Sequence, residues 1–198
     1  MKKSISFIMA LILMMSIAAC GSHDTSAEAT TEHSTAPTEP STVPTTEPFN
    51  IEDYKSLVSN CVTEIYDGSV VLSNIISFEY KYLKAYKNIA GSSAEPDSEM
   101  VVETGIKGIE ENSEHTEESV KENYNDISTM YKDIVILDTG NAEAIEIMAA
   151  FKEMHEAYVG LYNLAFSPDL DMSALASSHD EYIKTIKNSK SVLDILLS

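Results

Sequence analysis

Apolar residues recur every three or four positions from residue 51 to the last residues of the chain, and no stretch alternates convincingly between apolar and polar residues. This spacing places apolar side chains on one face of an α-helix, whereas a half-buried strand needs strict alternation. In the first stretch the repeat runs through Tyr54, Val58, Cys61, Ile65, Leu72, Ile76, Leu83 and Tyr86. The pattern therefore predicts an all-α domain.

Glycine, proline and short polar residues interrupt this pattern at 91–96, 138–141 and 167–171, where helices are expected to end. We expect helices over 51–90, 99–137, 141–166 and 171–198, joined by short loops into an antiparallel up-and-down four-helix bundle. At 1.5 Å per residue the first two helices would be near 60 Å long and the last two near 40 Å. The first helical hairpin is therefore predicted to be longer than the second.

The extra length of the first hairpin has two interpretations. If both helices are straight, their tip protrudes and exposes aromatic and apolar side chains, which are typical of partner surfaces. The aromatic residues at this predicted partner-binding tip are Phe78, Tyr80, Tyr82 and Tyr86. Leu83, Met100, Val101 and Ile106 accompany them. Alternatively, the helices break at Asp67–Gly68 and near Thr116, whose following glutamates favour a new helix start.

The first twenty residues indicate export and attachment to a membrane. Lys2 and Lys3 precede an apolar stretch over 5–17 and a small-residue exit, the arrangement of a cleaved secretory signal peptide. Ile17-Ala18-Ala19-Cys20 resembles the lipobox of bacterial lipoproteins. This resemblance implies cleavage before Cys20 and attachment of lipid to its thiol, which would anchor the chain stably because two acyl chains suffice for this.

A spacer follows the predicted anchor. Residues 21–49 are rich in Thr, Ser and Glu and hold four of the six prolines, a composition that cannot form a packed core. We therefore predict a signal peptide over 1–19, a lipidated cysteine with a disordered spacer over 20–49, and a helical domain over 50–198. The spacer style and the absence of arginine resemble Gram-positive lipoproteins, which implies the extracytoplasmic face of the cell membrane.

Strong negative charge excludes one class of partner. Without Lys2 and Lys3 the chain has 11 lysines against 32 acidic residues, a formal charge of about −21. Such a field repels the phosphates of nucleic acids. The densest acidic stretch, Glu110–Glu122, is interpreted either as a solvated helix face or as a docking face for a basic partner.

Histidines and carboxylates suggest one weaker alternative, a metal site. Counting along straight helices from the loops brings Glu64, Glu122, His155 and His179 to similar heights, and such a mixed set suits zinc or another divalent ion. The Glu-x-x-His signature of di-iron bundles is absent from the sequence, which argues against this class. The competing interpretation places His155 in a tyrosine-rich layer with Tyr124 and Tyr182.

No nucleophile elbow, phosphate loop or His-Glu-x-x-His motif occurs in the chain, so we do not expect an enzyme or a cofactor. Cys61 lies on the apolar stripe and is expected to be a buried hydrophobe. The sequence favours a lipid-anchored extracytoplasmic module that binds another protein. The alternative is a bundle that binds a small molecule or a divalent metal. Homodimerisation through the long hairpin is compatible with the same pattern.

Overall fold

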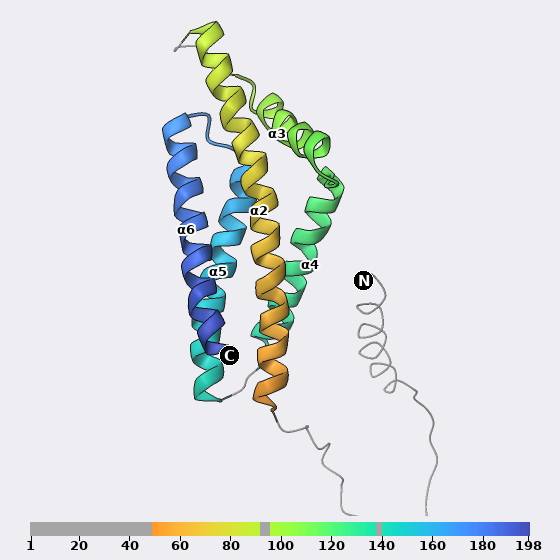
Figure 1. Cartoon of the computed structure of the whole chain (residues 1–198), viewed down its shortest axis with the longest axis vertical. Helices are drawn as coiled ribbons and strands as arrows, with labels where there is room; N and C mark the ends of the chain where they lie inside the picture. Colours follow the sequence, from red (N-terminus) through yellow and green to blue (C-terminus); the bar gives the residue numbers. More distant parts are fainter. Residues whose placement is uncertain (1–48, 92–95, 138–139) are drawn as a thin grey trace, which may run out of the picture. The chain divides into compact units, whose positions relative to one another are not determined.

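The computed structural model describes residues 49–91, 96–137 and 140–198, and these residues form five α-helices and no strand. In chain order the helices are α2 (Ile51–Ala90), α3 (Ser98–Asn112), α4 (Glu117–Val135), α5 (Ala142–Phe166) and α6 (Met172–Leu196) (Figure 1). The prediction of an all-α domain is confirmed. The predicted signal peptide, Cys20 and the spacer up to residue 48 lie outside the described residues.

Side chains cap the start of each of these helices. Asn50, Asp97, Asn141 and Asp171 accept hydrogen bonds from backbone N–H groups in the first turn that follows each of them. These N–H groups lack partners inside the helix, so the caps stabilise the starts. The predicted starts of the last two helices, at 141 and 171, are therefore correct to within one residue.

Helix α2 remains continuous through Gly68, so the alternative break at Asp67–Gly68 is wrong. Gly68 is buried where a Cβ atom would lie 2.8 Å from Asn123 Oδ1 on α4 and 2.9 Å from the Tyr158 hydroxyl on α5. A glycine costs an exposed helix about 1 kcal/mol relative to alanine. Here it permits the close approach of side chains from two neighbouring helices.

The predicted helix over 99–137 is divided into α3 and α4, so its prediction as one helix is wrong. The backbone leaves the helical conformation between Ser113 and Thr116, where Thr116 begins α4. Thr116 and Ser119 form a reciprocal capping box, in which each side chain accepts from the backbone N–H of the other. These bonds satisfy donors at a new helix start, which is the break that the alternative interpretation placed near Thr116.

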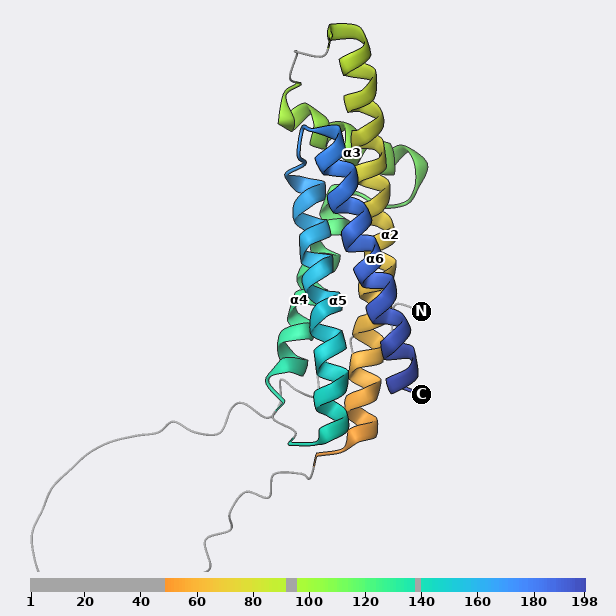
Figure 2. The same ribbon diagram turned by 90° about the vertical axis from the view of Figure 1, so that its left-hand side faces the viewer.

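Helix α2 contacts each of the other four described helices and contributes the largest share of the core. Helices α2 and α5 run in one direction and α4 and α6 in the other, with α5 and α6 side by side (Figures 1 and 2). The last turns of α2 extend past the connection between α5 and α6, and α3 packs beside them. None of the described helices is long and apolar enough to cross a membrane.

Two glycines allow α3 to approach α2. Gly108 lies against the ring of Phe78, and Gly105 lies against Ile75 and Glu79. A Cβ atom at Gly105 would be 2.8 Å from Ile75 Cγ2, closer than packed carbon atoms come. The small residues on this face of α3 therefore set its distance from α2.

We predict that Gly108→Ala destabilises the domain by about 1–3 kcal/mol, because the new methyl group overlaps the Phe78 ring and overpacking has costs of this size. Urea unfolding followed by circular dichroism measures the change. Glu111→Ala, an exposed substitution on the same helix, should change the free energy of unfolding by less than about 0.5 kcal/mol. Equal effects of the two substitutions would contradict the close packing of α2 and α3.

Candidate functional site

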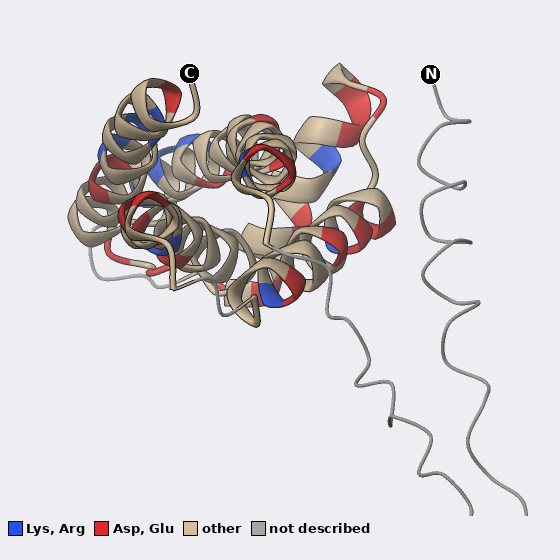
Figure 3. Ribbon diagram, turned by 90° about the horizontal axis from the view of Figure 1, so that it is seen from below, with Lys and Arg blue, Asp and Glu red and all other residues tan. Residues whose placement is uncertain are grey.

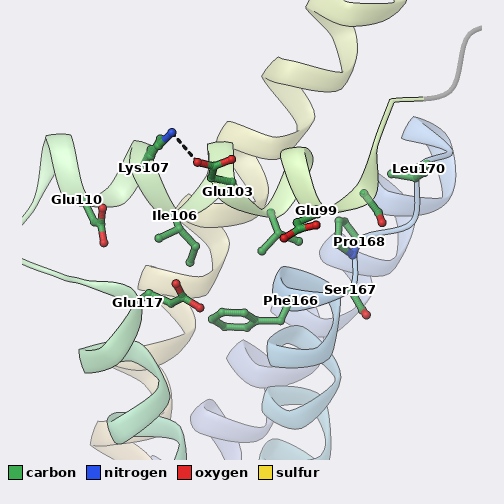
Figure 4. Close-up of a pocket in the computed structure, with 12 residues that line it drawn as sticks. Glu99, Glu103, Ile106, Lys107, Glu110, Glu117, Phe166, Ser167, Pro168 and Leu170 are labelled. Atoms are coloured by element: carbon green, nitrogen blue, oxygen red, sulfur yellow. Dashed lines mark ion pairs between the residues drawn. The ribbon is translucent and has the colours of Figure 1, made fainter.

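A groove lies between α3, the start of α4 and the connection from α5 to α6. Its volume is about 810 Å³, within the usual range for ligand pockets. Ile106 points from α3 toward the ring of Phe166 at the end of α5, and Glu117 lies beside that ring (Figure 4). The lining residues are Ser98, Glu99, Val102, Glu103, Ile106, Lys107, Glu110, Glu117, Phe166, Ser167, Pro168 and Leu170.

One face of α3 forms the longest wall of this groove. Its groove residues recur every three or four positions from Ser98 to Glu110, which places them on a single side of the helix. Val101, Gly105, Gly108 and Ile109 are buried and belong to the other side. Helix α3 therefore presents an apolar face to the core and a mixed face to the groove.

The apolar part of the groove consists of Val102, Ile106, Phe166, Pro168 and Leu170. Ile106 and Pro168 are buried, whereas the other three side chains are partly accessible. We refer to Val102, Phe166 and Leu170, the accessible apolar residues of the groove, as the apolar strip. Such a strip favours a ligand that has an apolar side.

Carboxylates dominate the polar edges of the groove. Its lining contains four glutamates and one lysine. Lys107 forms an ion pair with Glu103 at 2.7 Å, and Lys121 of α4 forms another with Glu117 at 2.5 Å. Glu99 and Glu110 contribute further negative charge. The groove therefore has excess negative charge beside an apolar strip, and acidic residues predominate elsewhere on the domain (Figure 3).

An aromatic layer fills the space between α4 and α5, where the sequence suggested a ligand or metal. The Tyr131 and His155 rings are parallel, with centroids 3.7 Å apart. Tyr124 stacks on Tyr162 at 3.8 Å, and the Tyr158 hydroxyl donates to Asn123 Oδ1 at 3.2 Å. The prediction that His155 lies with Tyr124 and Tyr182 is wrong in its residues, because His155 stacks on Tyr131, Tyr124 stacks on Tyr162, and Tyr182 packs against Gly160.

The four predicted metal ligands are not brought together. Among the described residues no group of three or more His, Cys, Asp or Glu side chains is placed to hold a metal ion. His155 stacks on Tyr131, while His179 is bonded to Ser73, and Glu64 accepts from Asn123 at 3.4 Å. Counting along straight helices was misleading, because the break at Ser113–Thr116 and the rotation of each helix determine where side chains point.

Ser73, His179 and Asp180 form a hydrogen-bonded row that the sequence did not suggest. The Ser73 Oγ atom lies 2.7 Å from His179 Nε2, and His179 Nδ1 lies 3.1 Å from Asp180 Oδ1. These distances resemble those of a hydrolytic triad. However, Ser73 lies within α2, whose backbone N–H groups are engaged in helical bonds and so cannot form an oxyanion hole beside it. We therefore interpret the row as a polar link between α2 and α6.

The remaining sequence candidates have structural roles. Cys61 is fully buried, and burial raises the pKa of its thiol to about 12. It is therefore protonated at neutral pH and unsuited to act as a nucleophile. Asp171 caps α6 by accepting from the backbone N–H groups of Ser173 and Ala174, and these two bonds lower its pKa.

The four aromatic residues of the predicted tip are half-buried. Phe78 packs on Gly108, and the Tyr82 hydroxyl lies 2.8 Å from Met100 Sδ. Tyr80 lines a smaller cavity of about 220 Å³ together with His179 and other residues of α2 and α6. Tyr86 lies 6.2 Å from the Tyr82 ring centroid. Part of this aromatic surface is therefore covered by α3, and its use as a partner surface remains a prediction.

Besides the Ser73–His179–Asp180 row, two further features were missed from the sequence. The groove was missed because it exists only where α3 turns away from α4. Glu79 was also missed, although it lies at the position between Ile75 and Leu83 where the apolar spacing of α2 predicts a hydrophobic residue. Glu79 is fully buried, and a carboxylate in an apolar stripe was the available signal.

Comparison with known proteins finds no matching family model, no matching curated protein and no matching solved structure. We therefore infer function from the groove and its chemistry.

We predict that His155 titrates below its usual pKa of 6.5, since burial disfavours the charged imidazolium and outweighs the opposing effect of Glu156. The neutral ring then predominates at pH 7. An NMR titration of the His155 ring protons measures this value. Tyr131→Ala should raise the pKa by exposing the ring to water, while Tyr82→Ala on the distant α2–α3 contact should not. An upward-shifted His155 would contradict the desolvated layer.

Proposed function

We propose that this chain is a protein-interaction module whose acidic groove binds a basic, amphipathic segment of another protein. The observation that carries the proposal is the combination, in one groove, of an accessible apolar strip with four glutamates and a single lysine. Val102, Phe166 and Leu170 offer apolar contacts, and the glutamates at the edges complement lysine or arginine side chains. Recognition by apolar anchors and opposite charge is a common mode for amphipathic peptides.

The dimensions of α3 suit such a segment. The 15 residues of α3 extend about 22 Å at 1.5 Å per residue, the length of a peptide helix of about four turns. Apolar anchors spaced three and four residues apart on that peptide would meet the accessible side chains of Val102 and Phe166, while its basic residues would meet Glu99, Glu103 or Glu110. This match favours a helical segment over a small molecule.

Within this proposal, α2, α4, α5 and α6 act as an up-and-down four-helix support. Helix α3 is an additional element beside the far end of α2, and it carries the groove wall. The opposite end of α2 begins directly after the predicted spacer. Such an arrangement would separate the binding groove from the point where the chain is tethered.

The proposed location is the extracytoplasmic face of the cell membrane, with lipid on Cys20 as the anchor. The lipobox-like sequence and the Pro-rich spacer support this location. We propose that the module is not an enzyme, because its Ser–His–Asp row lacks an oxyanion site and its only other cysteine is buried and protonated. Binding of a peptide in the groove accounts for its glutamates and apolar side chains better than catalysis does.

The binding test uses a synthetic helical peptide of about four turns with leucine on one face and lysine on the other. We expect the double variant Glu99→Gln/Glu110→Gln to bind it about two- to thirtyfold more weakly, because exposed charge pairs contribute about 0.2–1 kcal/mol each. Isothermal titration calorimetry measures the dissociation constant. Binding should also weaken from about 0.01 M to 0.15 M ionic strength, because salt screens exposed charges.

Two matched controls separate the groove from general charge attraction. Glu153→Gln/Glu181→Gln removes two exposed glutamates of α5 and α6 outside the groove and should leave the affinity nearly unchanged. A peptide with glutamate in place of lysine should not bind. Equal weakening by the two double variants would show that the groove is not the binding site.

The anchor is tested separately. We predict that Cys20→Ser abolishes incorporation of an azide-labelled fatty acid and releases the protein from the membrane fraction of a bacterial host, because the thiol that would carry the lipid is gone. Cys61→Ala removes the other cysteine and should leave labelling intact. Persistent labelling of the Cys20→Ser variant would contradict the proposed lipidation site.

A further inference from the structure

Glu79 is a carboxyl group in the core between α2 and α3. Its residue has no exposed surface, and neither of its carboxyl oxygens has a hydrogen-bond partner among the described residues. Buried polar side chains nearly always have such partners. The cost of keeping Glu79 here points to a role beyond packing.

Helix α3 covers this carboxyl group at close range. A Cβ atom on Gly105 would lie 2.8 Å from Glu79 Cγ and 3.0 Å from Oε1. Ile75, one turn earlier on α2, meets the same glycine. Water could therefore reach the carboxyl group from this side only if α3 moved away from α2.

Within the part of the chain that the structure describes, no cation forms an ion pair with this carboxyl group. On α3, Glu103 and Lys107 pair with each other and are about 60 % exposed. On α2, Lys81 lies over the Phe78 ring. His179 of α6 is bonded to Ser73 and to Asp180, and the last ten residues of α5 contain no charged side chain. Burial alone raises the pKa of Glu79, to about 9.

We infer that Glu79 is a proton-dependent latch, which holds α3 against α2 while its carboxyl group is protonated and favours separation of the two helices when it ionises. The inference rests in part on the proposed function, because α3 forms the longest wall of the binding groove. Protonation of Glu79 would then preserve the groove, and ionisation would weaken it.

The pH dependence of α3 packing follows from the pKa of Glu79 in two states, one with α3 packed on α2 and one with Glu79 exposed. With α3 packed on α2 the pKa of Glu79 is about 9, whereas an exposed glutamate has its ordinary value of 4.5. The packed state therefore binds the proton more tightly, so its advantage is full below pH 4.5 and is lost as the pH rises toward 9. Between these values the packing equilibrium should fall about tenfold per pH unit.

Hydrogen exchange followed by mass spectrometry, on the full chain in detergent and without any peptide, tests the latch. After correction for the intrinsic exchange rate, we expect the protection of α3 amides to fall about tenfold per unit from pH 5 to pH 8. Amides in the middle of α5 serve as the internal reference and should not follow this slope. Since no peptide is present, failure of the latch and failure of the proposed binding function are distinguishable.

Three variants complete the test. Glu79→Gln keeps the shape but cannot ionise, so its α3 protection should not depend on pH after the same correction. Glu79→Met removes the polar atoms and provides the same comparison if the amide disturbs the core. Glu111→Gln, on the exposed face of α3 and outside the groove, should retain the wild-type slope. Protection of α3 that is independent of pH in the wild type, or an unchanged slope in both Glu79 variants, would overturn the inference.

Discussion

The packing of four helices on α2 is the constraint on which the rest of the structure depends. A helix of 40 residues presents apolar side chains on several sides, and the burial of these side chains supplies the main favourable free energy of folding. Gly68 admits side chains of α4 and α5, and Gly105 and Gly108 admit α2 side chains against α3. The glycines thus determine how closely the neighbours approach, and the position of α3 determines where the groove opens.

The groove is the place where the acidity of the chain is combined with accessible apolar side chains. Surface charge alone favours solubility and repels other anions. At the groove, however, glutamates lie next to accessible apolar side chains, and the cations of Lys107 and Lys121 are already paired. A partner with both basic and apolar side chains would complement both the glutamates and the apolar side chains of the groove. A nucleic acid or a purely apolar surface would not complement both.

The helical fold could be predicted from apolar spacing, because Tyr54 to Tyr86 and the later stretches repeat at three and four residues. The last two helices were also well bounded, since Asn141 and Asp171 are strong caps. The sequence left two alternatives for residues 113–116, a continuous helix or a break, because a capping box at Thr116 competes there with helix-forming glutamates. The groove and the Ser73–His179 contact could not be predicted, because they depend on helix rotation and on side chains from distant parts of the chain.

The most direct test of the proposed function is an NMR map of backbone amide shifts, recorded while the lysine–leucine helical peptide is added to the chain without its signal segment and lipid. If the peptide binds in the groove, we expect the largest shifts in residues 98–110, near Glu117 and in residues 166–170, and small shifts along the middle of α6. Shifts concentrated on α6, or spread evenly over all acidic surfaces, would contradict a specific groove for a basic amphipathic partner.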